Sequence, residues 1–160
     1  MKKIKKQDVF TLAFYVISAE LVGGLSALLS GDFKDFFDKY EQPPLQPPQW
    51  LFPVVWVILY AIMGVSAYLI HTAETDSISR KNAMTLYWGQ LAVNFSWSII
   101  FFRFELLWAA VAAILLLLAL IISMIISFRK IRPLAAYLNL SYLAWVAFAT
   151  YLNIAIAVIN

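Results

Sequence analysis

Long apolar stretches separated by short polar stretches dominate the chain. Five of these stretches reach the roughly 20 residues that a helix needs to cross about 30 Å of hydrocarbon. We therefore predict an all-α integral membrane protein, a five-helix transmembrane bundle that forms a single domain over residues 1–160. The predicted spans cover about residues 9–30, 50–72, 83–102, 106–128 and 133–159.

The connection between the first two predicted spans is long and rich in proline. Residues 31–49 hold four of the six prolines of the chain, in the stretch Pro-Pro-Leu-Gln-Pro-Pro. Proline lacks a backbone N–H and interrupts helices, so this stretch favours an extended polyproline conformation. Two interpretations remain open, which are a stiff linker and a lid over a pocket between the helices.

The composition agrees with a membrane protein. Hydrophobic residues make up 63% of the 160 residues, against roughly 45–50% in ordinary globular domains, and the mean hydropathy is +0.80. A chain this short has too little interior to bury so much apolar surface in water. We expect the lipid bilayer as a partner and no nucleic acid, because the net charge of +3 arises from residues in loops.

The basic residues predict the orientation. With five spans, the N-terminus and the second and fourth loops share one side, which carries nine of the twelve Lys and Arg residues. The other side carries Lys34, Lys39 and Arg103. Because Lys and Arg concentrate on the cytoplasmic side, we predict a multi-pass cell-membrane protein with its N-terminus in the cytoplasm and its C-terminus outside.

Three predicted spans carry polar and aromatic residues at helical spacing. The stripes are Gln90, Asn94, Trp97 and Phe101 in the third span, Trp56, Tyr60, Gly64, Ala67 and His71 in the second, and Tyr142, Trp145, Ala149 and Asn153 in the fifth. Each stripe alone could serve interhelical hydrogen bonding and packing. Because the three stripes converge in one half of the bilayer, we predict a shared aromatic pocket for a flat, largely apolar ligand.

The first predicted span carries an isolated acid and a stripe of small residues. Glu20 lies at its middle, and no basic residue lies inside any span, so its carboxyl is expected to be neutral. It either bonds to a neighbouring helix or contacts a ligand or relays protons. Ala19, Gly23 and Ala27 allow another helix to approach closely, from the same chain or from a partner subunit.

Known catalytic and metal-binding patterns are absent from the sequence. The chain has no cysteine and a single histidine, His71, at the end of the second span, which argues against cysteine zinc sites and haem ligation in the pocket. There is no Ser/His/acid set, no carboxylate pair, no phosphate loop and no HExxH motif. We expect no metal and no resident cofactor, and enzymatic activity stays open.

Several strings occur in a characteristic order along the chain. They are Gln46-Pro47-Pro48-Gln49-Trp50, Val55-Trp56, Leu59-Tyr60, Met63-Gly64, Gly89-Gln90-Leu91 with Asn94 and Trp97, Phe101-Phe102, Tyr142-Leu143-Ala144-Trp145, Phe148-Ala149-Thr150 and Leu152-Asn153. Together they resemble the translocator protein family, also called TspO/MBR proteins, tryptophan-rich sensory proteins or peripheral benzodiazepine receptors. The chain resembles a bacterial-type member.

The resemblance implies a five-helix fold, a homodimer, and a pocket beneath the first loop. It implies a receptor that binds porphyrins, isoquinoline and benzodiazepine ligands and, in some members, sterols, with a link to light-dependent breakdown of protoporphyrin. By matching positions, the implied ligand-binding residues are Trp50, Tyr60, Asn94, Trp97, Phe101, Trp108, Trp145 and Ala149. Trp50 and Trp145 are the candidates for porphyrin chemistry.

The sequence also departs from the family pattern. Pro44-Leu45 replaces the usual Pro-Ser-Trp, so one tryptophan of the first loop is missing. The residues after Leu152-Asn153 lack the Tyr and basic residue of a proposed sterol motif. We predict a binding protein for porphyrin-like ligands with at most a weak photo-oxidative activity. The alternatives are a porphyrin or sterol transporter, a porphyrin enzyme and an assembly subunit, and the lack of an inverted repeat argues against the transporter.

Overall fold

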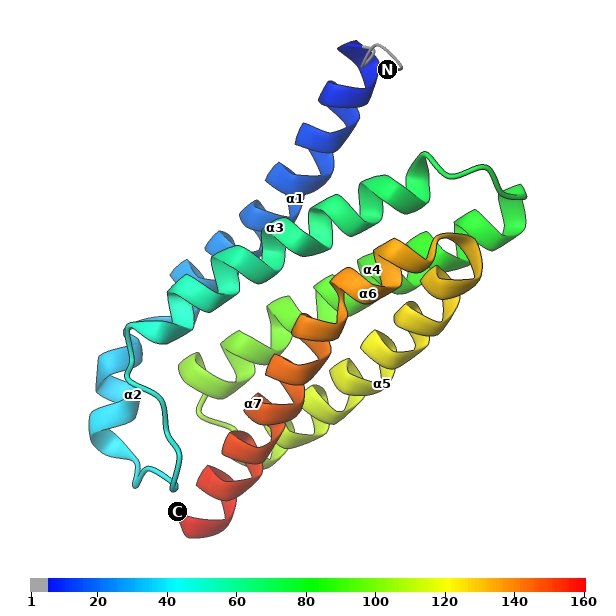
Figure 1. Ribbon diagram of the computed structural model, residues 1–160. Coiled ribbons are helices and arrows are strands. Elements are labelled where there is room, and N and C mark those ends of the chain that lie inside the picture. Colours follow the sequence, from blue (N-terminus) through cyan, green and yellow to red (C-terminus); the bar gives the residue numbers. More distant parts are fainter. Residues whose placement is uncertain (1–5) are drawn as a thin grey trace.

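The computed structural model describes residues 6–160 as a bundle of helices (Figure 1). Lys2, Lys3 and Lys5, which contribute to the predicted orientation, lie outside the described residues. The elements are α1 (Lys6–Ser30), α2 (Phe33–Lys39), α3 (Leu51–His71), α4 (Ser77–Ser98), the π-helical turn η1 (Ile99–Arg103), α5 (Leu107–Ile131), α6 (Pro133–Leu138) and α7 (Leu140–Ile159).

Four segments of the described chain are long and apolar enough to cross a membrane: Gln7–Ser30, Leu51–His71, Leu107–Ile131 and Pro133–Ile159. They confirm an all-α membrane protein but not the count of five spans. The predicted span 83–102 falls on α4 and η1. Helix α4 has 22 residues, which is long enough, but Arg80, Lys81 and several amide and hydroxyl side chains reduce its hydropathy.

The polar face of α4 points into the bundle. Gln90 and Asn94 are 0% and 1% exposed, although α4 is the least apolar of the long helices. Helix α4 packs mainly on α5 and also touches α1 and α3, while α5 packs on α7 (Figure 1). Helices α4 and α5 follow each other in the chain and pack side by side, with η1 in the connection between them.

Helices α1 and α3 approach each other through glycines. A Cβ on Gly64 would lie 2.5 Å from the Val16 Cα, and a Cβ on Gly23 would overlap the ring of Tyr60. Ala19 is fully buried. The small stripe of α1 is therefore buried within the same chain at Ala19 and packs on α3 at Gly23.

We expect Gly64→Ala to destabilise the bundle, because the new methyl group meets the backbone of α1 and pushes the two helices apart. Such overpacking costs about 1–3 kcal/mol. Gly89→Ala is the matched control, since a Cβ there meets open space and alanine favours a helix by roughly 0.5–1 kcal/mol over glycine. Thermal unfolding in detergent measures both, and equal midpoints for the two variants would contradict this account.

Candidate ligand-binding pocket

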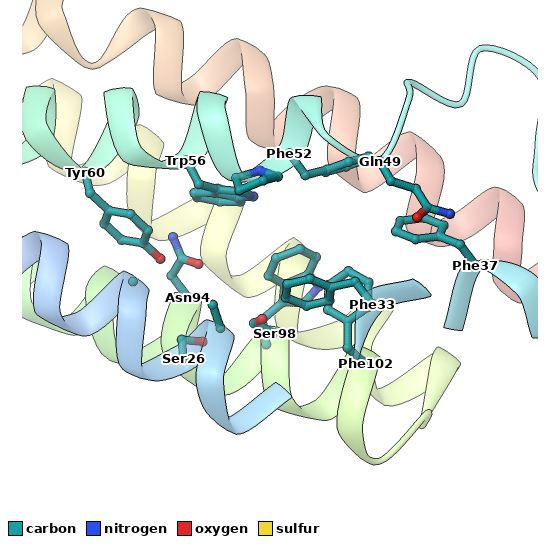
Figure 2. Close-up of a pocket in the computed structure, with 14 residues that line it drawn as sticks. Ser26, Phe33, Phe37, Gln49, Phe52, Trp56, Tyr60, Asn94, Ser98 and Phe102 are labelled. Carbon is teal, nitrogen blue, oxygen red and sulfur yellow. The ribbon is translucent and has the colours of Figure 1, made fainter. Parts of the chain in front are cut away.

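A cavity of about 100 Å³ lies between α1, α3 and α4 (Figure 2). Side chains of α2 and η1 close one end of it, which we call the upper end. Seven of its fourteen lining residues are aromatic and none is charged. The lining residues are Gly23, Ser26, Ala27, Phe33, Phe37, Gln49, Phe52, Pro53, Trp56, Tyr60, Asn94, Trp97, Ser98 and Phe102.

Helical spacing places the aromatic wall. Phe52, Trp56 and Tyr60 follow each other at steps of four and so share one face of α3. The Trp56 and Tyr60 side chains lie next to each other on α3 (Figure 2), with 5.6 Å between their ring centroids. The Trp56 ring also lies 6.1 Å from that of Trp97 on α4. Opposite them, α1 contributes only Gly23, Ser26 and Ala27. Large rings on one side and small side chains on the other leave room for a flat molecule.

Buried hydrogen bonds hold the polar side chains at the pocket floor. The Asn94 Nδ2 donates to the Tyr142 hydroxyl at 2.9 Å, and that hydroxyl donates to the Gln90 Oε1 at 2.7 Å. The Trp97 Nε1 donates to the Asn153 Oδ1 at 3.0 Å. The polar stripes thus join helices and also reach the cavity. Within residues 6–160, the Tyr60 hydroxyl and the Asn94 Oδ1 form no hydrogen bond, which leaves both free for a ligand.

Part of the first loop is a short helix that covers the pocket. Asp32 caps α2 by accepting a hydrogen bond from the Lys34 N–H at 2.8 Å. Phe36 is 2% exposed, with its ring 4.7 Å from Phe101 and 5.1 Å from Phe102. Phe33 and Phe37 line the cavity from above. Of the two interpretations of the loop, the structure therefore favours the lid.

Polar tethers fasten the lid to other parts of the chain. The Lys39 Nζ and the Tyr40 hydroxyl both donate to the Glu105 Oε2, the latter at 3.1 Å. The hydrogen bond from Lys39 holds the pKa of Glu105 below its ordinary value and raises the pKa of Lys39. Farther along, the Glu41 N–H donates to the Asn160 Oδ1 at 2.9 Å. The Tyr151 hydroxyl donates to the Pro44 carbonyl at 2.9 Å.

The structure brings together some of the residues that the sequence proposed. Tyr60, Asn94 and Trp97 line the cavity. Phe101 and Ala149 line a cavity of about 20 Å³ that shares Phe37, Phe52, Trp97 and Phe102 with the first. Trp145 lies in a groove between α3 and α7, where its ring is 5.8 Å from that of Phe52. It thus stands behind the aromatic wall.

Two of the residues that the sequence proposed, Trp50 and Trp108, are not among those that line the cavity. They are 65% and 64% exposed. Trp50 precedes α3 and is six residues from Trp56, a spacing that on a helix turns a side chain about one-third of a turn away from the inward face. Trp108 lies in the first turn of α5, on its exposed side. Both rings fit the aromatic belt at a membrane surface.

Sequence reasoning missed most of the remaining lining residues. Spacing could have found Phe52, which lies four residues before Trp56, and Phe102, which adjoins Phe101. Phe33, Phe36 and Phe37 have the three-and-four spacing of an amphipathic helix, a signal hidden in a loop dominated by prolines. No local signal marks Ser26 or Ser98, because their role depends on where α1 and α4 meet α3.

Comparisons with known proteins agree with this architecture. Residues 11–159 match the TspO/MBR family. The chain is 34% identical over 130 residues to the translocator protein of Homo sapiens, covering 80% of this chain and 76% of that protein. It is 35% identical over 121 residues to the tryptophan-rich protein TspO of Archaeoglobus fulgidus, covering 75% and 76%. It is 28% identical over 153 residues to protein CrtK of Rhodobacter capsulatus, covering 92% and 91%. A match over nearly the whole chain shows that this protein belongs to the TspO/MBR family.

Proposed function

We propose that this chain is a multi-pass membrane receptor for porphyrins, such as protoporphyrin and haem-like tetrapyrroles, and for isoquinoline or benzodiazepine-type molecules. The observation that carries the proposal is the cavity wall, which is half aromatic and free of charge. Aromatic rings stack on flat conjugated molecules. A few polar groups then fix the orientation of the ligand, and here these are the Asn94 Oδ1 and the Tyr60 hydroxyl.

Binding of such a ligand requires the lid to move. The cavity has a volume of about 100 Å³, whereas pockets for drug-sized ligands hold roughly 300–1,000 Å³. Helix α2 is the element to displace, since it covers the cavity and its Lys39 tether is exposed. Gly31, between α1 and α2, has a φ of 85°. This conformation favours glycine and makes Gly31 a suitable hinge.

Any light-dependent breakdown of a bound porphyrin would draw electrons from nearby indoles. Trp56 and Trp97 line the cavity, and Trp145 lies behind Phe52. Trp50 is exposed at the surface. We therefore shift the candidate for this chemistry from Trp50 to Trp56 and keep Trp145 as a second donor.

The alternative function is transport of the same ligand. Helix α3 continues below the pocket towards the loop that joins it to α4. Its inward residues there, Met63, Ala67 and Ile70, are fully buried. A closed floor of this kind supports a receptor over a channel-like path. The proposal further includes a homodimer. It also includes five membrane crossings, which are the four apolar segments and α4, because the polar face of α4 is covered by its neighbours.

Trp56→Ala should weaken protoporphyrin binding by several-fold or more. One stacked ring contributes about 0.5–1.5 kcal/mol beyond its buried area, and 1.4 kcal/mol is tenfold in affinity. Trp56→Phe keeps a ring and should largely retain binding. Fluorescence titration of the purified protein in the dark measures these affinities.

Trp88→Ala is the matched control for the pocket. Trp88 lies near the middle of α4 and is not among the residues that line the cavity. Its ring packs on that of Tyr87, with 5.0 Å between the centroids, and it is 40% exposed. Its loss should leave protoporphyrin affinity nearly unchanged. An equal loss for Trp88→Ala and Trp56→Ala would place the ligand outside the described cavity.

Glu105→Gln should speed ligand association by loosening the lid, with little change in thermal stability because the ion pair is exposed. Since the pKa of Glu105 is lowered, the tether is intact at neutral pH and is lost as the pH falls through that lowered pKa. Stopped-flow fluorescence with protoporphyrin measures the rate. Glu74→Gln, in the loop after α3, is the control and should associate at the original rate. Unchanged rates for Glu105→Gln would show that this tether does not hold the lid.

A reporter fused to the C-terminus tests the crossing number and the orientation. With a cytoplasmic N-terminus and five crossings, the C-terminus lies outside, so a reporter active only outside the cytoplasm should give signal. A second fusion in the first loop, after Tyr40, should report the same side. A C-terminal reporter active only in the cytoplasm would contradict five crossings or the orientation, and the loop fusion separates these two cases.

A further inference from the structure

Glu20 occupies the seam between α1 and α3, directly below the pocket. On α1, Val16, Glu20 and Gly23 follow at steps of four and three and share one face. Val16 meets Gly64, and Gly23 lies against the Tyr60 ring. Glu20 therefore sits between these two contacts, one helical turn from the lining residue Gly23, and its side chain is half-buried.

The Glu20 carboxyl has no hydrogen-bond or ion-pair partner within residues 6–160. The bond to a neighbouring helix, which the sequence left open as one alternative, is not formed there. An ionisable group in the hydrocarbon layer is costly and is retained for a partner. Lys and Arg occur only in the loops and at the ends of the described helices, so a second copy of the membrane-spanning region offers no cation at this depth either. A bound molecule can supply the missing partner.

Tyr60 connects this carboxyl to the pocket. Its side chain lines the cavity beside Asn94 (Figure 2), and Glu20 is close enough to Tyr60 for an electrostatic interaction between them. The Tyr60 hydroxyl has no hydrogen-bond partner in the described chain. A hydroxyl can accept a hydrogen bond from a ligand and donate its own proton to a carboxylate. Tyr60 can therefore bridge a ligand and Glu20.

We propose that Glu20 and the Tyr60 hydroxyl form a subsite for a protonated amine at the floor of the pocket. The inference rests on the proposed function, since it names the ligand class of the same pocket. The preferred ligand is a flat aromatic molecule that carries an ammonium group on the edge nearest the floor of the pocket. Carboxylates of a ligand remain at the outer mouth, where Arg103 lies beside Gly31, because the cavity itself is lined by no basic residue.

Two isoquinoline carboxamides test the subsite, one with a dimethylaminoethyl arm and one with an uncharged alkyl arm of the same shape. Affinities of the purified full chain are measured at pH 7 by titration. The original protein should prefer the amine probe. Glu20→Gln should weaken binding of the amine probe by about tenfold or more, equal to about 1.4 kcal/mol, and change that of the alkyl probe by less than about twofold. Glu74→Gln, the matched control, should change neither affinity.

A double-variant comparison tests the bridge. Tyr60→Phe keeps the ring but removes the hydroxyl, so it should also weaken binding of the amine probe. Because both residues act on one ammonium group, the double variant should bind that probe about as weakly as Glu20→Gln alone. Additive losses would overturn the bridge through Tyr60.

The remaining outcomes separate this inference from the proposed function. If a folded protein, checked by its thermal transition, binds neither probe and no porphyrin, the proposed function and the subsite both fail. If both probes bind equally well, or Glu20→Gln affects both equally, only the subsite fails. If Glu20→Gln abolishes a crosslinked dimer and leaves the amine preference intact, Glu20 belongs to an interface with a second copy, and the subsite is also overturned.

Discussion

The burial of the polar face of α4 is the constraint on which the rest of the structure depends. Amide side chains are costly in hydrocarbon, so Gln90 and Asn94 must point away from lipid. They do so by bonding to Tyr142 on α7, while Trp97 bonds to Asn153 on the same helix. Helix α4 is thereby drawn into the bundle between α1, α3 and α5. The long helix that is least apolar by composition is thus held by buried side-chain hydrogen bonds.

This arrangement explains how a pocket can exist in so apolar a chain. Once Asn94 and Trp97 face inward, the small residues of α1 and the rings of α3 enclose the space beside them. The α1–α3 seam is tight where Gly64 meets Val16, and the lining residues of α1 begin one turn beyond Glu20, at Gly23. The pocket is therefore a gap left between helices that are held together elsewhere, and the lid closes its outer end.

The lid and the floor of the pocket meet different physical requirements. At the lid, aromatic packing of Phe36 is combined with exposed polar tethers at Glu105 and Asn160. Exposed ion pairs contribute little to stability, so the lid can be displaced without unfolding the bundle. At the floor, the unpaired Glu20 carboxyl lies at a depth where water offers it little solvation. This asymmetry gives the two ends of the pocket different preferences for charge.

The sequence by itself determined the membrane class, four of the five predicted spans, the inward stripe of Gln90, Asn94, Trp97 and Phe101, and the family. The spans and the stripes follow from hydropathy and from the helical repeat, which are properties of neighbouring residues, and the family follows from short strings in a characteristic order. Only the tertiary structure decided that Trp56 rather than Trp50 faces the cavity, that α2 forms a lid, and that Glu20 forms no hydrogen bond or ion pair among residues 6–160. Those outcomes depend on how each helix is rotated and how closely it approaches segments far away in the sequence. Hydropathy and periodicity do not specify the contacts between such segments, so side-chain packing between helices decides them.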